Sequence, residues 1–177
     1  HLSIRRQRQM CIRDSIKIRY NREKKLKGRE NMSEVKHLEI NYKTDELFED
    51  FREFGNKDLY MVEELKGQMI DASSDSPFYG IFVGDKLAAR MALLDKGEVE
   101  ETYFPDCDDY ILLWKLEVLE KYQGRGYAKK LIDFAKENNK PIKAIARKNS
   151  KDYFLKHGFE DVEAKNPEGH DVLIWKP

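Results

Sequence analysis

The chain has 177 residues, of which 40% are hydrophobic and 37% are charged, and this suits one globular domain with a core of ordinary size. Its two cysteines, Cys11 and Cys107, exclude a disulfide-stapled scaffold, and no apolar run approaches the roughly 20 residues that a membrane helix needs. These features predict a protein of the reducing cytoplasm that makes no membrane contact.

The formal net charge of zero hides an asymmetry along the chain. Residues 1–31 hold 11 Lys and Arg against 3 Asp and Glu, a net charge of +8, so the rest of the chain carries −8. This basic N-terminal segment has three interpretations: a disordered tail that binds nucleic acid, an organelle transit peptide, or a spurious extension. The third follows from codons, because "KGREN" before Met32 can be encoded by an almost unbroken purine tract, as in a bacterial ribosome-binding site.

The division of the chain follows from this charge pattern. We expect translation to begin naturally at Met32, so that residues 1–31 are a basic, disordered extension and residues 32–177 form the functional domain. The intact mass of protein made from the native locus tests this expectation. Residues 32–177 are acidic, so they are not expected to bind nucleic acid.

The first part of the domain shows helical and β-type patterns in turn. A short strand is expected near residues 37–40, and apolar residues that recur at intervals of three and four predict amphipathic helices over 45–55 and 59–72. Two β-type runs in residues 78–95 meet at Gly84-Asp85, which predicts a hairpin.

An acidic segment and a buried strand follow. Residues 98–109 contain six acidic side chains, which indicate either a solvated loop or an acidic lip that attracts cationic amines. Residues 110–119 are almost all apolar, β-branched or aromatic, and this is typical of a central strand buried on both faces.

Two glycines, Gly124 and Gly126, lie between that strand and an amphipathic helix that begins near Tyr127. Residues without side chains let the backbone approach a ligand, and a helix N-terminus offers unpaired N–H donors to a phosphate. The stretch "GRGYAK" lacks the GKS or GKT ending of an NTPase P-loop. It also lacks the third glycine of a dinucleotide fingerprint, so both of those classes fit poorly.

The order of these features resembles the GNAT N-acetyltransferase superfamily. Gln123, Gly126 and Ala128 match that family's Q/R-x-x-G-x-G/A motif, and "LEV" at residues 116–118 ends the strand before it. Residues 144–162 are similar to the family's later strand, helix and "GF" pair, here Gly158-Phe159. The resemblance covers most of residues 38–177 and is strongest over 110–160.

The resemblance implies an α/β fold, a mixed sheet with flanking helices in which two central strands splay apart around acetyl-CoA. The acetyl group would pass directly to an amine in a ternary complex, with no metal. One strand edge would pair with the pantetheine arm, and the glycine turn would bind the pyrophosphate. The residues expected to bind acetyl-CoA are Leu116, Val118, Gln123, Gly124, Arg125, Gly126, Tyr127, Ala128 and Asn149.

The catalytic residues are less completely specified. Glu117 is the candidate general base, because it lies in an apolar strand where burial would raise its pKa; the alternative is a carboxylate that only pairs with a lysine. Family members often carry a tyrosine four residues before the "GF" glycine, but this chain has Phe154 there. Tyr153, about 100° away around a helix, is the candidate general acid, and a packed aromatic is its alternative role. Asn149 is expected either to cap the helix after it or to contact the cofactor.

The predicted function is therefore transfer of an acetyl group from acetyl-CoA to a small-molecule or peptide amine. Phe154 favours one alternative, a module that binds acyl-CoA with little catalysis. The basic N-terminal segment favours another, a protein associated with nucleic acid. No pattern in the sequence encodes the acceptor, the acyl length or the oligomeric state.

Overall fold

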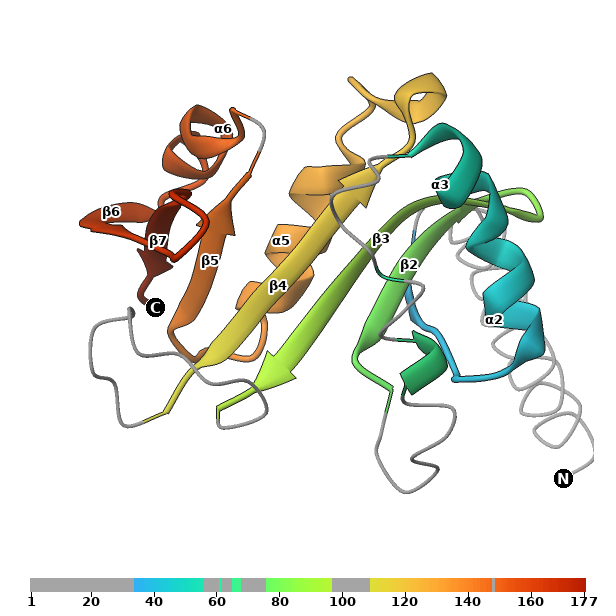
Figure 1. Cartoon of the computed structure of the whole chain (residues 1–177), viewed down its shortest axis with the longest axis horizontal. Helices are drawn as coiled ribbons and strands as arrows, with labels where there is room; N and C mark the ends of the chain where they lie inside the picture. Colours follow the sequence, from blue (N-terminus) through green and yellow to red (C-terminus); the bar gives the residue numbers. More distant parts are fainter. Residues whose placement is uncertain (1–33, 56–60, 62–64, 68–75, 97–108, 148) are drawn as a thin grey trace, which may run out of the picture. The chain divides into compact units, whose positions relative to one another are not determined.

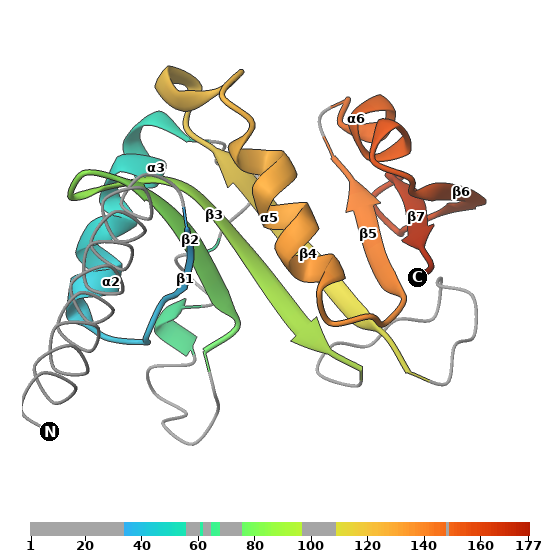
Figure 2. The same ribbon diagram turned by 180° about the vertical axis from the view of Figure 1, so that it is seen from behind.

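A computed structural model describes residues 34–55, 61, 65–67, 76–96, 109–147 and 149–177 of the chain. Residues Val35–Pro177 form one compact unit. This unit is a single mixed sheet with helices on both of its faces (Figures 1 and 2). The α/β architecture expected from the sequence is confirmed.

The sheet has seven strands in the order β1-β2-β3-β4-β5-β7-β6. Neighbouring strands run antiparallel except β4 and β5, which are parallel. The strands are β1 (Val35–His37), β2 (Phe78–Val83), β3 (Lys86–Asp95), β4 (Ile111–Val118), β5 (Ile142–Ala146), β6 (Glu160–Lys165) and β7 (Asp171–Trp175). The parallel pair in the middle therefore joins two antiparallel halves.

Helices cover opposite faces of the sheet. The helix α5 (Tyr127–Lys136) packs Leu131 and Ile132 against one face, as Figure 2 shows from that side. The helices α2 (Tyr42–Leu47) and α3 (Glu49–Phe54) pack against the other face through Phe48 and Phe51. Residues 61 and 65–67 are also helical, and a 3-10 turn, η2 (Glu120–Tyr122), and the helix α6 (Lys151–Lys156) follow later in the chain.

The predicted elements agree with the structure in type, with two differences in extent. The hairpin at Gly84-Asp85 is confirmed, since β2 and β3 pair on either side of it. The strand expected near 37–40 begins and ends earlier, at Val35–His37. The helix expected over 45–55 is divided at Phe48, which ends α2 and begins α3. Most of the helix expected over 59–72 and the acidic residues 98–108 lie outside the described residues.

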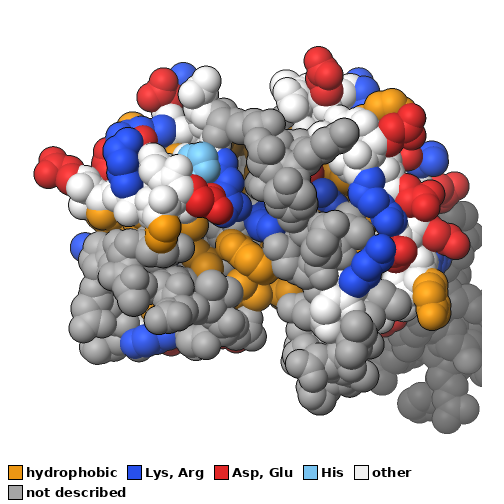
Figure 3. Space-filling view, viewed as in Figure 1, with side chains coloured by type: hydrophobic (Ala, Val, Ile, Leu, Met, Phe, Trp, Pro, Cys, Tyr) orange, Lys and Arg blue, Asp and Glu red, His pale blue; other side chains and the backbone are white. Residues whose placement is uncertain are grey.

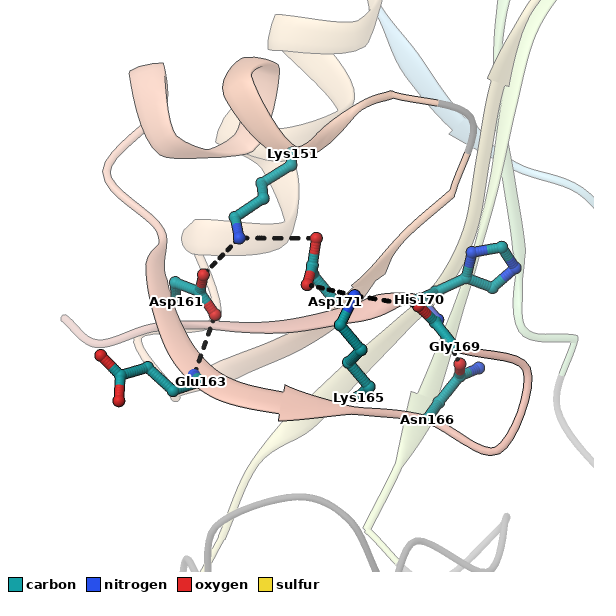
Figure 4. A network of polar contacts seen from close by, with 8 residues as sticks. All are labelled: Lys151, Asp161, Glu163, Lys165, Asn166, Gly169, His170 and Asp171. Atoms are coloured by element: carbon teal, nitrogen blue, oxygen red, sulfur yellow. Dashed lines mark hydrogen bonds and ion pairs between the residues drawn. The ribbon is translucent and has the colours of Figure 1, made fainter.

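An ion-pair network fastens α6 to the last two strands (Figure 4). The Lys151 ammonium donates to Asp161 and lies 3.4 Å from Asp171, and the backbone N–H of Glu163 donates to Asp161 at 2.9 Å. The hydrogen bond from Lys151 and the bond from Glu163 lower the pKa of Asp161, while the bond to Asp161 raises the pKa of Lys151. The network holds α6, which carries Tyr153, against the sheet.

Candidate functional site

The two central strands separate part-way along their length. Pairing between β4 and β5 is confined to residues 111–113 and 142–144. Beyond that point β4 stays beside β3 as far as Val118, while β5 stays beside β7 as far as Ala146. The two strands diverge in both views of the ribbon (Figures 1 and 2), which confirms the predicted splay.

A cavity of about 740 Å³ opens where the strands separate. Its described walls come from the end of α3, from β4, from the glycine turn with the start of α5, and from the end of β5 with α6. Figure 3 shows Lys, Arg and hydrophobic side chains toward the middle of this face, with Asp and Glu mainly toward its margins. The lining residues are Phe54, Gly55, Leu113, Trp114, Lys115, Leu116, Glu117, Val118, Glu120, Tyr122, Gln123, Gly124, Gly126, Tyr127, Ala128, Ile145, Arg147, Ser150, Tyr153 and Phe154.

The glycine turn has the backbone that its sequence predicts. Gly124 and Gly126 have φ values of 72° and 80°, in the left-handed region that favours glycine. A Cβ atom built on either residue would meet no atom within 4 Å, so space is open beside both. The Gln123 side chain donates from Nε2 to the Val118 carbonyl at 3.0 Å and so ties the turn to the end of β4.

The start of α5 presents backbone donors at the same place. The helical hydrogen bonds begin with the Lys130 N–H, which donates to the Gly126 carbonyl at 3.1 Å. The amides of the first helical turn therefore precede the hydrogen-bonded ladder and are oriented to bind an anion. Tyr127 and Ala128 belong to this turn and line the cavity, but Arg125 is exposed and is not among the lining residues. The guanidinium of Arg125 lies 5.6 Å from the centre of the Tyr122 ring.

Glu117 is buried on β4, but its surroundings differ from the apolar ones expected. Its Oε2 accepts from Arg90 Nη2 at 2.9 Å and from Arg90 Nε at 3.3 Å, and the two side chains are only 7% and 3% exposed. The guanidinium lies 4.6 Å and 4.3 Å from the ring centres of Phe48 and Phe51. Register explains the pairing, because Arg90 lies directly opposite Glu117 on β3. The expectation of a purely apolar site for Glu117 is therefore wrong.

Tyr153 and Phe154 both line the cavity although they are adjacent on α6. Phe154 is buried against Phe159, with ring centres 5.1 Å apart, so it is part of the core. Tyr153 is half-buried, and this burial, together with the negative charge of Asp133, raises the pKa of its hydroxyl. A phenol with a raised pKa keeps its proton through the neutral range and remains a donor.

Asn149 does not cap α6, which was one of the two roles expected for it. It has a φ of 59°, is exposed and is absent from the lining residues. Ser150, rather than Asn149, occupies the N-cap position of α6, and no side chain makes the capping hydrogen bond there. Two neighbours that the sequence analysis missed, Arg147 and Ser150, line the cavity instead. The available signal was the resemblance of residues 144–162 to the family's later strand and helix, because side chains that follow a strand end often face a site.

The described residues contain neither a cluster for a metal ion nor a helix for a membrane. No group of three or more His, Cys, Asp and Glu side chains among them is placed to hold a metal ion. In the same part of the chain, no helix has both the length and the apolar character required to cross a membrane.

A family model described as "Acetyltransferase (GNAT) domain" matches residues 39–171, which is most of the chain. The chain belongs to the GNAT acetyltransferase family. The match spans the splayed strands, the glycine turn and α6, so the resemblance seen in the sequence motif is confirmed and the protein is an acetyltransferase.

This acetyltransferase is similar to proteins from staphylococci and a bacillus. It is 83% identical over 146 residues, 82% of this chain and all of the relative, to a Staphylococcus epidermidis protein named as an uncharacterized N-acetyltransferase. A Staphylococcus aureus protein with the same kind of name is 81% identical with the same coverage. A solved structure is also similar: the Bacillus subtilis N-acetyltransferase YlbP in complex with coenzyme A. The two chains are 45% identical in sequence and superpose with a TM-score of 0.63, and the match covers 82% of this chain and 97% of the YlbP chain.

Proposed function

We propose that this acetyltransferase binds acetyl-CoA in the cavity between β4 and β5 and passes the acetyl group directly to an amine in a ternary complex. One observation carries the proposal: a single cavity reaches from the glycine turn to both Glu117 and Tyr153. YlbP, 45% identical, has been solved with coenzyme A, which supports the choice of donor. The proposal concerns residues 32–177, and nothing in it requires a metal.

The binding of acetyl-CoA is divided between two kinds of backbone. The edge of β4 at Leu116 and Val118 would pair with the amides of the pantetheine arm like an added strand. The pyrophosphate would lie at Gln123–Ala128, where the glycines leave space and the first turn of α5 offers its N–H donors. The open space beside Gly124 and Gly126 fits an anion that must approach the backbone closely.

The chemical step assigns one role to each of two side chains. The Glu117 carboxylate would accept a proton from the attacking amine as the C–N bond forms. As the C–S bond of the thioester breaks, the Tyr153 hydroxyl would give its proton to the departing thiolate. Arg90 is then a positioning residue, because its two contacts with Oε2 fix the orientation of the Glu117 carboxylate.

The acceptor side of the site also includes Gly55. A Cβ atom on Gly55 would stand 2.7 Å from Glu117 Oε1 and 2.3 Å from the Phe51 carbonyl oxygen, so only glycine fits there without a shift. The close approach of α3 to the carboxylate narrows the space around Glu117. This is consistent with a base that meets the acceptor inside a confined pocket.

Thermal unfolding of the full chain with acetyl-CoA, combined with an assay of thiol release, tests the proposal. Ligand at 100 times its dissociation constant should stabilise the chain by about 2.7 kcal/mol. An amine panel should then release free CoA, and Glu117→Gln should lower kcat by about 100-fold or more with little change in acetyl-CoA affinity. Stabilisation without thiol release from any amine would favour the alternative of a binding module. Absence of both would refute the proposal.

A further inference from the structure

A cation lies at the wall of the cavity formed by the end of β5. Arg147 follows directly after β5 and lines the cavity, and its side chain is 16% exposed. Its Nη1 is buried and has no hydrogen-bond partner among the residues that the structure describes. The ion pair that Arg147 makes is long, with Nη2 3.7 Å from Oε2 of Glu168, a side chain that is 63% exposed. A buried N–H without an acceptor is costly, so a ligand that brings oxygen acceptors would be stabilised here.

The alternation of side chains along β5 places Arg147 on a definite face of the sheet. Ala144 and Ala146 pack in the cluster that contains Ile132 of α5. Ile145 packs on the opposite side, in the cluster that Trp114 of β4 contacts. Because successive strand residues point to opposite faces, Arg147 lies on the side of Ile145. It is therefore on the face of the sheet that lies away from α5.

Glu117 lies on that same face, across the opening. It pairs with Arg90, whose guanidinium lies against the rings of Phe48, between α2 and α3, and Phe51 of α3. These helices cover the face away from α5. The last paired residues of the two strands are Leu113 and Ala144, and Arg147 lies three residues beyond Ala144. On β4, three residues beyond Leu113 lead to Leu116, which is next to Glu117. Arg147 and the proposed base, Glu117, therefore line the cavity from its two opposite walls.

This location separates Arg147 from the place expected for the pyrophosphate. The glycine turn leads into α5, which packs on the other face of the sheet. A cation beside the base, rather than beside the glycine turn, is positioned to meet the acceptor. Lys115 is buried, lines the same cavity and lies with its ammonium 4.5 Å from the centre of the Trp114 ring. The described wall on the acceptor side thus has basic side chains on both strands.

We propose that the acceptor carries an anionic group, a carboxylate or a phosphate, in addition to its amine, and that Arg147 binds this group. The inference rests on the proposed acetyl transfer. A guanidinium binds either anion with two parallel N–H donors, which would satisfy the buried Nη1 and orient the amine toward Glu117. Free amino acids, peptide termini with a nearby carboxylate and aminoalkyl phosphates belong to this class. Polyamines and aminoglycosides do not.

Matched acceptors test the inference with the full chain and acetyl-CoA. Thiol release is measured with each standard amino acid against its C-terminal amide, and with O-phosphoethanolamine against ethanolamine. Removal of the anion should lower kcat/KM by about 10- to 100-fold, and the preferred pair tells a carboxylate from a phosphate. Arg147→Gln should abolish this preference while the affinity for acetyl-CoA stays the same, and Arg147→Lys should retain part of it. Lys156→Gln, which removes a charge from an exposed position on α6, is the matched control.

Each remaining outcome has a definite meaning. Equal transfer to charged and neutral members of every pair would overturn the inference and leave the proposed acetyl transfer intact. Weaker binding of acetyl-CoA by Arg147→Gln, with the preference kept, would assign Arg147 to the donor and also overturn it. If the chain binds acetyl-CoA but transfers to no member of the panel, the acceptor class named here is wrong. Failure to bind acetyl-CoA at all would instead contradict the proposed function.

Discussion

The buried ion pair between Arg90 and Glu117 makes a quantitative prediction about stability. The two side chains are 3% and 7% exposed, and the guanidinium is packed against two phenylalanine rings. Removing one partner of such a pair typically costs about 3–5 kcal/mol, because the other charge loses a close ionic partner while it stays largely buried. For a unit the length of Val35–Pro177, this should lower the melting temperature of Arg90→Met by roughly 10–15 °C.

A double-mutant cycle separates the pair from the packing around it. Arg90→Met, Glu117→Gln and the combined variant are compared by urea unfolding followed by far-ultraviolet circular dichroism. The combined variant should be less destabilised than the sum of the single variants, by at least about 1 kcal/mol, because the second change removes the uncompensated charge. Lys129→Met provides an exposed control, since its ion pair with Asp133 joins two largely solvated side chains on α5 and should contribute little.

The same cycle has outcomes that refute the reasoning. Single effects that add to within about 0.5 kcal/mol would mean that Arg90 and Glu117 do not couple in solution. A loss of less than about 1 kcal/mol in Arg90→Met would mean that the carboxylate finds equal compensation elsewhere. Either result would also remove the reason to treat Arg90 as the residue that positions the base.

Three further predictions concern the cofactor turn, the general acid and the C-terminal network. Gly126→Glu should fold but should no longer be stabilised by acetyl-CoA. Gly84→Glu is the control: Gly84 is another left-handed glycine with open space, so this variant should have similar backbone strain but should still be stabilised by acetyl-CoA. Thermal unfolding of both variants with and without acetyl-CoA measures the difference. Tyr153→Phe should lower kcat by about 10- to 100-fold without changing the affinity for acetyl-CoA. The pKa of the Tyr153 hydroxyl is raised, so the wild-type rate should fall at alkaline pH only above the ordinary pKa of a tyrosine. Asp161→Asn should lower the melting temperature at neutral pH. Because the folded-state pKa of Asp161 lies below the unfolded value of roughly 4, the difference should be complete above that pH, shrink as the pH falls through the lowered pKa and vanish below it. Retention of the difference in strong acid would contradict the ion pair with Lys151.

Local patterns in the sequence were sufficient to predict most of the fold. The hairpin at Gly84-Asp85 and the helix from Tyr127 follow from residue periods and turn residues within a few positions of each other. The division of the first helix at Phe48 was not predictable in this way, since apolar residues continue at helical spacing across it. Tertiary packing decides that break, because Phe48 is fully buried against the sheet.

The candidate site was predictable only where it is built from backbone. The left-handed backbone at Gly124 and Gly126 could be predicted from the sequence, because few residues other than glycine adopt a positive φ. The partner of Glu117 depends instead on strand register, and a bulge leaves Trp114 without an opposite residue between the pairs Leu93–Leu113 and Ala92–Lys115. No pattern within β4 reveals that irregularity. Arg147 likewise acquires its position from the separation of two strands that are distant in the sequence.

The separation of β4 from β5 explains why one cavity can serve both substrates. Each strand keeps its outer neighbour to its end, so the opening needs no loss of pairing with β3 or β7. Past Leu113, however, no strand among the described residues pairs with the inner edge of β4, and backbone groups on such an edge favour any ligand that can pair with them. An arm that carries amides would satisfy this edge, while side chains that alternate along β4 direct Glu117 to the face away from α5. The donor would then lie in the plane of the sheet, with the acceptor reaching it from the face away from α5, where Glu117 and Arg147 line the cavity.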